Sequence, residues 1–578
     1  MKKMFLSLVE ATFTYLSILI YNNVIFKTGS YNILFLMAFF IFFNFYYKDD
    51  LKINNKIKKY SLILGLCFSL ILSIGSIVST YISKGPVIIF GLKNFIYAVI
   101  STVGFTILFF KVFKHFFHNM GKIQIVEEHS DDEKKIFIIG NIIILMVHSL
   151  YFIRYYPGIM TADSYAILHN ANNFILDDFN TFGHTWFVGA FFHLGKFLFH
   201  NMNAAVAFFI IIQMIIMSFI FTAVIRFLYK KGLSKRICVS LFAFYALNPL
   251  HAHYSVTLWR DVMFGGSFVL LLISLYEMVD CKKTETKYYI LFVIGSLIML
   301  FFRNNGIYIF LFMFPFIIFL LKYKRFLMII MCGCIIIVYF IIKGPVFDCL
   351  NVRRSTPAEA YSIPYQQIAR VISSGAYIDD SHRKYFERLF SYDQISESYN
   401  PIVSNSIKNL SDSYYLDDNK AKFFSNYVTL FFQYPRIYVE AYMLQTLGYW
   451  YPDTIYWATG GESSSIFESE DIYTNSLTPD WYNSIIDSTT SRRVPFNNLI
   501  WSVGLPFLLL IFSSFVMFYL GKKKYIVSFV PLYGLWISIM LAAPVYSELR
   551  YVYGLFTCLP LFLLLPYIDC KKGIIKSK

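Results

Sequence analysis

Apolar runs of about 17–25 residues, the length that an α-helix needs to cross a bilayer, recur from end to end of this 578-residue chain. In lipid, backbone groups must be hydrogen-bonded within the protein, which continuous runs of this length achieve as helices. We therefore predict an all-α polytopic membrane protein with about 14 transmembrane helices. The expected spans are 5–25, 31–47, 60–82, 88–113, 136–155, 203–228, 237–256, 262–279, 287–302, 305–321, 326–343, 498–519, 525–543 and 551–568.

Basic residues gather in alternate loops between these spans. They fall near 2–3, 48–59, 226–236, 282–287, 322–325 and 522–524, and again from Lys571 onward. Cytoplasmic loops carry such an excess of Lys and Arg, so both termini are expected in the cytoplasm. The net charge of +16 is then loop charge and does not indicate a nucleic-acid partner.

Two long segments fall on the opposite, external side. The first is 156–202, whose apolar stretch 186–199 is short and carries His193 and Lys196. We interpret that stretch as an interfacial or re-entrant helix. The second segment is 344–495, about 150 residues long, which is enough for an independent domain.

The second external segment is expected to be mainly helical. Helices are predicted over 358–373, 380–390 and 418–447, and a loop over 449–480. The domain organisation that follows is N-terminal transmembrane helices at 1–135, a transmembrane core at 136–343 with the external loop 156–202, the extracytoplasmic domain at 344–495, and C-terminal helices with a cytoplasmic tail at 496–578.

Several classes of soluble enzyme are excluded by missing motifs. The chain has no GxGxxG, no GxxxxGK[ST] and no HExxH sequence. It also has no Asp-x-Asp motif of the kind that holds the metal of a nucleotide-sugar, which argues against a cytosolic nucleotide-sugar transferase. A reaction at the external face must then use a substrate that is already activated on the membrane.

The strongest candidate for chemistry is Asp163. The run 155–164 leaves a predicted span on the external side, turns at Pro157-Gly158, and places Asp163 just beyond the membrane. A carboxylate there can act as general base toward a hydroxyl group. The alternative is that Asp163, followed by Ser164, simply caps a helix over 164–175.

Cations lie at the same membrane face. Arg260, Arg303 and Arg550 each sit at the external end of a span. Arginine binds phosphate through its planar guanidinium, so the three are candidates for binding a phosphate group. The alternative for each is an interfacial side chain that snorkels to the membrane surface. Supporting roles are assigned to Ser164, Asp178, His184, Asp261 and Glu548.

Histidines give a weaker signal. His251 and His253 are two residues apart, so they do not share a helix face, and no metal site is predicted from them.

Five runs together resemble a known family. They are Tyr156-Pro-Gly with Asp163-Ser164, Trp259-Arg-Asp-Val-Met-Phe264, Arg303-Asn-Asn-Gly-Ile-Tyr308, Ile363-Pro-Tyr-Gln-Gln-Ile-Ala-Arg370, and Glu548-Leu-Arg-Tyr551. The chain resembles, over about 136–568, a largely uncharacterised bacterial multi-spanning family of the GT-C glycosyltransferase-like clan. The resemblance implies a GT-C-like core at 136–343, a catalytic acid at Asp163 in an external loop with membrane-parallel helices, and a bacterial plasma-membrane location.

The residues and the resemblance together predict an inverting glycosyltransferase. It would move a sugar from a polyprenyl-phosphate-type donor to a cell-envelope glycan or lipid at the outer face, with Asp163 as base and Arg260, Arg303 or Arg550 on the phosphate. Members of the clan differ in using a divalent cation, which stays open; no other cofactor is expected.

Two other functions are weighed beside this one. A flippase or transporter of lipid-linked oligosaccharides would suit the number of spans, but such proteins tend to show inverted repeats and midplane polar groups, which we do not find. A surface-polysaccharide polymerase or ligase differs mainly in its acceptor.

Overall fold

The computed structural model describes residues 2–22, 37–43, 54–85, 87–120, 133–280, 284–355, 360–454, 456, 472–490, 497–542 and 544–568. Over these residues the protein is helical, with isolated β-bridges but no β-strand. The predicted span 31–47 lies largely outside the described residues.

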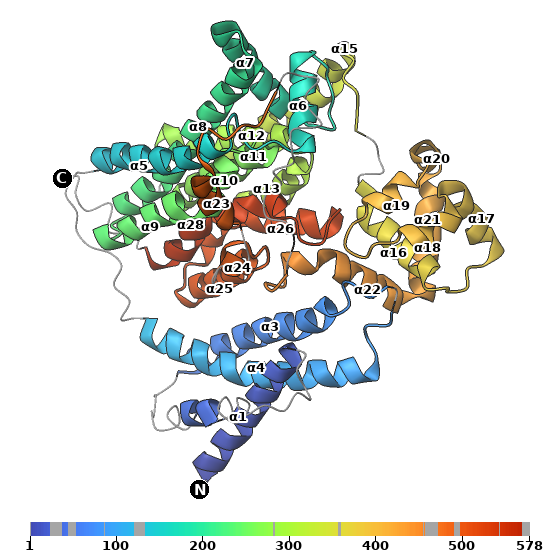
Figure 1. Cartoon of the computed structure of the whole chain (residues 1–578). Helices are drawn as coiled ribbons and strands as arrows, with labels where there is room; N and C mark the ends of the chain where they lie inside the picture. The colour runs from blue at the N-terminus through green and yellow to red at the C-terminus, as the bar shows by residue number, and fades with distance from the viewer. Residues whose placement is uncertain are drawn as a thin grey trace.

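Three N-terminal helices form a layer of their own, drawn in blue in Figure 1. They are α1 (Lys2–Tyr21), α3 (Asn55–Ser79) and α4 (Leu92–Asn119). The Lys111 side chain of α4 forms an ion pair with Glu10 of α1. The Ser73 hydroxyl of α3 donates a hydrogen bond of 3.0 Å to the Ser101 hydroxyl of α4. Paired polar groups of this kind let helices associate in lipid, where apolar packing alone gives little preference.

The central bundle is built from both halves of the remaining chain. Its first part comprises α5 (Glu133–Arg154), α8 (Met202–Lys230), α9 (Lys235–Leu247), α10 (Pro249–Ser255), α11 (Arg260–Asp280), α12 (Thr286–Phe302), α13 (Gly306–Leu320) and α14 (Arg325–Ile341). Its C-terminal part comprises α24 (Asn497–Ile500), α25 (Leu505–Tyr519), α26 (Val530–Ala542), α27 (Tyr553–Thr557) and α28 (Leu559–Leu564). Helix α11 lies at the centre, since almost all of its apolar stretch is buried.

Helix length and composition indicate a multi-pass membrane protein. Seven described helices are long and apolar enough to cross a membrane, and the bent pair Leu549–Thr557 and Leu559–Tyr567 makes up to eight. Helices α12, α13, α25 and α26 are apolar but shorter.

These are fewer full-length helices than the fourteen predicted spans. The expected span 237–256 is divided between α9 and α10, because Asn248 caps a new helix whose first residue is Pro249. The expected last span is bent by 46°, next to Pro560. A proline removes a backbone hydrogen-bond donor and so interrupts a helix. The mean hydropathy of a segment does not reveal such a break.

The loop that the sequence predicts to be external forms a helical hairpin of α6 (Ala162–Asn172) and α7 (Phe182–Phe199). Helix α7 begins four residues before the predicted stretch 186–199 and packs on both α6 and α8. Its C-terminal side chains Phe197, Leu198 and Phe199 are exposed. A short linker then leads into α8, one of the helices long enough to span.

The segment that follows α14 begins with the turn Ile342–Val346 and α15 (Phe347–Cys349) and contains a separate helical unit, seen in yellow and orange in Figure 1. Its helices are α16 (Ser362–Ser373), α17 (Asp380–Leu389), α18 (Tyr392–Ser398), α19 (Asn405–Asn409), α20 (Ser413–Asp418), α21 (Lys420–Gln433) and α22 (Pro435–Thr446). One cluster of buried apolar side chains, including Tyr365, Phe386 and Phe423, forms its core. The predicted helix 418–447 is two helices that meet at Pro435.

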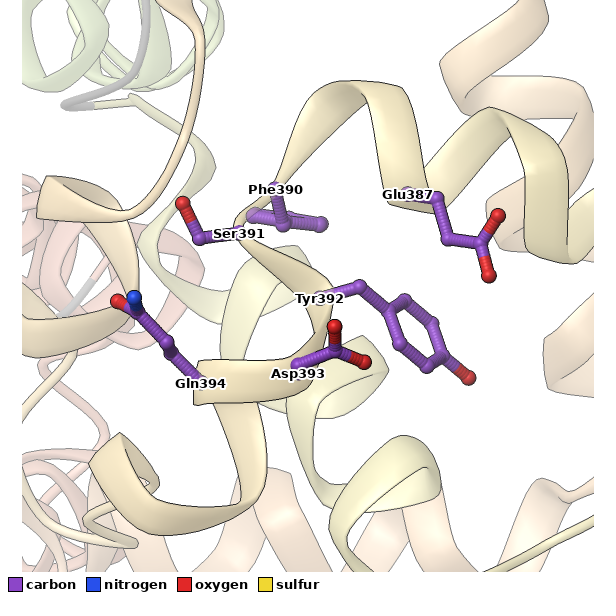
Figure 2. Close-up of a pocket in the computed structure, with 6 residues that line it drawn as sticks. All are labelled: Glu387, Phe390, Ser391, Tyr392, Asp393 and Gln394. Atoms are coloured by element: carbon purple, nitrogen blue, oxygen red, sulfur yellow. The ribbon is translucent and has the colours of Figure 1, made fainter.

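An opening of about 370 Å³ lies on this unit, between the end of α17 and the start of α18. Figure 2 shows the side chains around it, among them Glu387, Tyr392 and Asp393. Arg383 forms an ion pair with Glu387 at 2.8 Å and lies 5.5 Å from the Tyr392 ring centre.

The orientation of the helices gives the first testable prediction. Ser396 on α18 and Lys523 after α25 are both exposed, and the charge pattern places them on opposite sides of the membrane. In intact cells, an impermeant maleimide should label Ser396→Cys, and should label Lys523→Cys only after permeabilisation. The reverse pattern would show that the chain is inserted with the opposite orientation.

Candidate functional site

The start of α6 is capped by a residue other than Asp163. Thr161 is the N-cap, and it forms a capping box in which its backbone N–H donates to Ser164 Oγ at 2.9 Å. Ser164 Oγ also donates to the Leu258 carbonyl at 2.9 Å. The capping alternative for Asp163 is therefore wrong, because Thr161, two residues earlier, is the N-cap and its Oγ1 accepts from the Ser164 N–H. Ser164 is a structural residue here.

A short backbone pairing brings α6 beside the start of α11. Ile159 N–H donates to the Val256 carbonyl at 2.8 Å, and Leu258 N–H donates to Ile159 at 3.2 Å. Gly158 lies at φ +153°, where a Cβ atom would come within 2.8 Å of Ile210. The position thus requires glycine for both its backbone angle and its close packing.

Ion pairs then join three distant parts of the chain. Arg550 forms an ion pair with Asp163, 387 residues away, and its Nε lies 3.5 Å from Glu548. Arg303 forms an ion pair with Asp261, whose side chain is 1% exposed. These contacts bring the predicted residues of the site together, as ionisable groups near lipid require partners.

Aromatic rings lie against the two paired arginines. The Arg550 guanidinium lies 5.3 Å from the ring centres of both Trp259 and Tyr551, and that of Arg303 lies 4.5 Å from Tyr551. Trp259 is fixed in turn, since its indole N–H donates to Thr161 Oγ1 at 2.8 Å. Both rings fall within motifs noted in the sequence, but their contact with the arginines was not predicted.

Arg260 differs from the other two arginines. It donates a hydrogen bond to the Phe179 carbonyl at 2.7 Å, and within the described chain no carboxylate lies within ion-pair distance of it. Arg260 nevertheless lies close enough to Asp163 for its positive charge to lower the pKa of that carboxyl group. The site therefore holds one arginine whose charge is not neutralised by direct pairing.

The arginines set the protonation state of Asp163. Burial raises the pKa of this carboxyl group, but the positive charges of Arg550, Arg260 and Arg303 outweigh burial and hold the pKa below its ordinary value. Asp163 is consequently ionised at neutral pH, as a proton acceptor must be.

Two predicted supporting residues lie outside this cluster. Asp178 forms an ion pair with Lys343, and both contact Asn304, the neighbour of Arg303. Burial raises the pKa of Asp178 despite the lysine. His184 is buried against Phe302, with ring centres 5.5 Å apart, and makes no hydrogen bond within the described chain. The role of Lys343 was not predicted, because in the sequence it is simply the last residue of an expected span.

The remaining histidines are paired separately. His251 contacts the Tyr553 hydroxyl at 3.1 Å, and His253 contacts Thr489 Oγ1 at 3.1 Å. Among the residues that the structure describes, no group of three His, Cys, Asp or Glu side chains could hold a metal ion.

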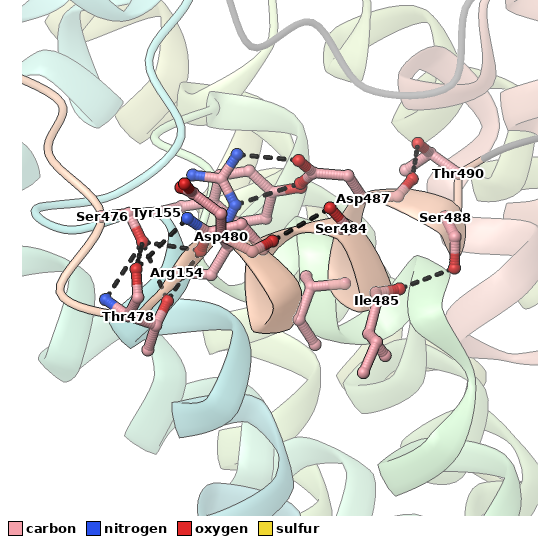
Figure 3. A network of polar contacts seen from close by, with 12 residues as sticks. Arg154, Tyr155, Ser476, Thr478, Asp480, Ser484, Ile485, Asp487, Ser488 and Thr490 are labelled. Carbon is pink, nitrogen blue, oxygen red and sulfur yellow. Dashed lines mark hydrogen bonds and ion pairs between the residues drawn. The ribbon is translucent and has the colours of Figure 1, made fainter.

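Polar contacts join the end of α5 to the segment that follows the helical unit of α16 to α22. Figure 3 shows Arg154 at the end of α5 facing Asp487 of α23 (Asp480–Ser488), with hydrogen bonds of 2.8 and 3.1 Å. The Tyr155 hydroxyl also donates to Asp487 at 2.8 Å. Nothing in the sequence marks Asp487, because its significance depends on a partner 333 residues away.

The helical unit of α16 to α22 contacts the segment that carries Glu548 and Arg550. Gln366 of α16 donates to the carbonyls of Asn400 and Val403 at 2.8 and 2.7 Å. The adjoining residues pair with that segment: Ser404 N–H donates to Pro544, and Tyr546 N–H donates to Ile402, both at 2.9 Å. This explains the Gln366 position of the Ile363–Arg370 motif as a structural support.

The pattern of one family covers residues 156–576 of the chain. The chain belongs to DUF6020. This is a family of unknown function, and its pattern includes the paired residues from Asp163 to Arg550 but not the layer of α1, α3 and α4. The DUF6020 chain matches no curated protein and no solved structure.

The Arg303–Asp261 pair allows a test of how the site is held together. Arg303→Gln should destabilise the DUF6020 protein by about 3–5 kcal/mol, because it leaves the buried Asp261 carboxylate unpaired. Arg354→Gln is the matched control, since Arg354 and Asp348 are both mostly exposed and such pairs contribute about 0–1 kcal/mol. Thermal unfolding in detergent measures both; equal effects would mean that Asp261 does not depend on Arg303.

Proposed function

We propose that this protein is an inverting glycosyltransferase of the GT-C type, which transfers a sugar from a polyprenyl-phosphate donor to a cell-envelope acceptor at the outer face of a bacterial plasma membrane. The observation that carries the proposal is an ionised carboxylate, Asp163, surrounded by three arginines of which Arg260 has no carboxylate partner among the described residues.

The arginines supply the phosphate site. Arg260 is the first contact, because its guanidinium makes one hydrogen bond to a carbonyl and retains donors for a phosphate oxygen. Arg550 and Arg303 are held by aromatic rings and by carboxylates, so they are fixed before the donor binds. Such preorganised charges stabilise a departing phosphate, and removing one contact of this kind slows a reaction by about 10²–10³.

Asp163 is the base in this proposal. While it is paired with Arg550, its basicity is reduced; a donor phosphate competes for Arg550 and releases the carboxylate. Asp163 then accepts the proton of the acceptor hydroxyl, whose oxygen forms a bond to the anomeric carbon. The bond from that carbon to the phosphate oxygen breaks, and its electrons leave with the phosphate. Attack from the face opposite the phosphate inverts the anomeric configuration.

The external unit is the proposed acceptor-binding part. Its segment 402–404 forms backbone hydrogen bonds with the residues just before Glu548. A ligand bound to the unit would therefore lie on a part of the chain that directly contacts the arginine site. The opening in Figure 2 offers an aromatic ring, Tyr392, together with the carboxylates Glu387 and Asp393. Hydroxyl groups of a glycan can donate to such carboxylates.

Replacing Asp163 tests the base directly. Asp163→Asn should lower transfer by about 10²–10⁴, because an amide cannot accept the proton. The helix should persist, since Thr161 and not Asp163 provides the cap. Asp417→Asn, which alters an exposed carboxylate paired with Lys420 on the external unit, is the matched control and should keep full activity. Transfer from polyprenyl-phosphate sugars in detergent is the assay.

The outcomes of this assay separate the functions. Full turnover by Asp163→Asn would remove Asp163 from the mechanism. No transfer by the unaltered protein with any lipid-linked sugar would favour a transporter, because detergent abolishes the two compartments that a flippase needs.

The pH dependence tests the influence of Arg550 on Asp163. Arg550→Gln removes the largest lowering influence on the Asp163 pKa, so the pKa should rise relative to the unaltered protein, although Arg260 and Arg303 remain. A base with a raised pKa becomes protonated at higher pH, and the acid limb of the residual activity should therefore move upward. The profile of kcat/KM between about pH 4 and pH 8 reports this shift. An unchanged acid limb, with Arg354→Gln as control, would show that another group titrates.

A further inference from the structure

A cavity of about 190 Å³ lies between α6 and α7, away from the paired charges. Its lining is almost entirely apolar and includes Ala171, Leu176, Trp186, Gly189 and Ala190. At Gly189 a Cβ atom would lie 3.6 Å from Ala171, an ordinary contact distance, so the two helices approach closely beside the cavity. An apolar lining of this kind suits a hydrocarbon better than water.

One polar group in the lining lacks a partner. Asn170 is 8% exposed, and its Nδ2 makes no hydrogen bond within the described chain. Leaving a buried amide donor unsatisfied is unfavourable. A ligand that is apolar along its length and carries a hydrogen-bond acceptor at one end would satisfy it.

The rim of the cavity is formed by exposed rings. Phe174, 75% exposed, has a left-handed backbone at φ +54° and stacks on the His193 ring with centres 4.6 Å apart. Trp186 is 56% exposed on the same side. A bulky residue in this backbone conformation is uncommon and marks places where structure is held for a function. Exposed Trp and Phe side chains of this kind are typical of the membrane interface.

The surroundings identify the occupant as a membrane component. The exposed apolar surface continues along α7 to Phe197, and α8 follows at once as a helix long enough to cross the bilayer (Figure 1). The exposed side chains of Trp186, Leu194 and Phe197 form one apolar strip along α7 that begins at the cavity. The small volume favours an unbranched chain over an isoprenoid, which carries a methyl branch on every fourth carbon.

We propose that the cavity between α6 and α7 binds one acyl chain of a membrane phospholipid, with its ester carbonyl accepting from Asn170. A bound chain would stabilise the hairpin of α6 and α7, which carries Asp163 in its first turn. Leu176, which lines the cavity, lies in the same loop as Phe179, whose carbonyl accepts a hydrogen bond from Arg260. This inference does not depend on the reaction that the protein catalyses.

Photolabelling tests the proposal. The full-length protein is reconstituted in vesicles of phosphatidylglycerol that carries a mid-chain diazirine, irradiated, and mapped by peptide mass spectrometry. Adducts are expected on the peptides that contain Leu176 and Ala190. Ala190→Trp fills the cavity from an exposed position and should lower these adducts about tenfold, equivalent to about 1.4 kcal/mol. Phe197→Trp, on the same helix but outside the cavity, should leave them unchanged.

A second variant provides an independent test in case Ala190→Trp does not fold. Asn170→Leu removes the amide donor while keeping the position filled, and should lower the same adducts severalfold without lowering the melting temperature. Equal labelling in Ala190→Trp, Asn170→Leu and the unaltered protein would overturn the proposal. Labelling of these peptides by a diazirine polyprenyl phosphate but not by the phospholipid would also overturn it, and would assign the cavity to an isoprenoid chain.

Discussion

The ion pair between Asp163 and Arg550 is the contact on which the arrangement of the site depends. It joins the first turn of α6 to the short helix before α27 across 387 residues, and Arg550 also approaches Glu548. Removing one partner of a buried ion pair is destabilising, so this pair ties the two halves of the bundle together at the site. The neighbouring Arg303–Asp261 pair extends the same constraint to α11 and α12.

Neutral contacts hold the backbone on which these charges sit. The Thr161–Ser164 box starts α6, and the pairing of Ile159 with Val256 and Leu258 fixes it beside α11. Because this framework is independent of the carboxylate, Asp163 is not needed to form the helix. A carboxylate that the helix start does not need, and whose pKa is lowered by nearby arginines, is a good candidate for chemistry.

The sequence indicates some parts of this arrangement and not others. Asp163, Arg260 and Arg303 could be found because single charges at the ends of apolar runs stand out against lipid. Asp487 and Lys343 could not, since their importance lies in partners that only the fold brings near. Apolar length overestimated the continuous spans, because it averages over the Asn248-Pro249 break. The Thr161 cap was overlooked because Asp163 was itself a plausible cap.

The burial of α11 has a consequence for biogenesis. Thr557 Oγ1 of α27 donates to the Gly265 carbonyl, and a Cβ atom on Gly265 would lie 2.6 Å from the Tyr553 ring. These partners leave the ribosome nearly 300 residues after α11 does. Throughout that interval the side of α11 that later contacts α27 lacks those partners. A chain that stops before the last helices would therefore contain the whole of α16–α22 but lack the contacts that cover this side of α11.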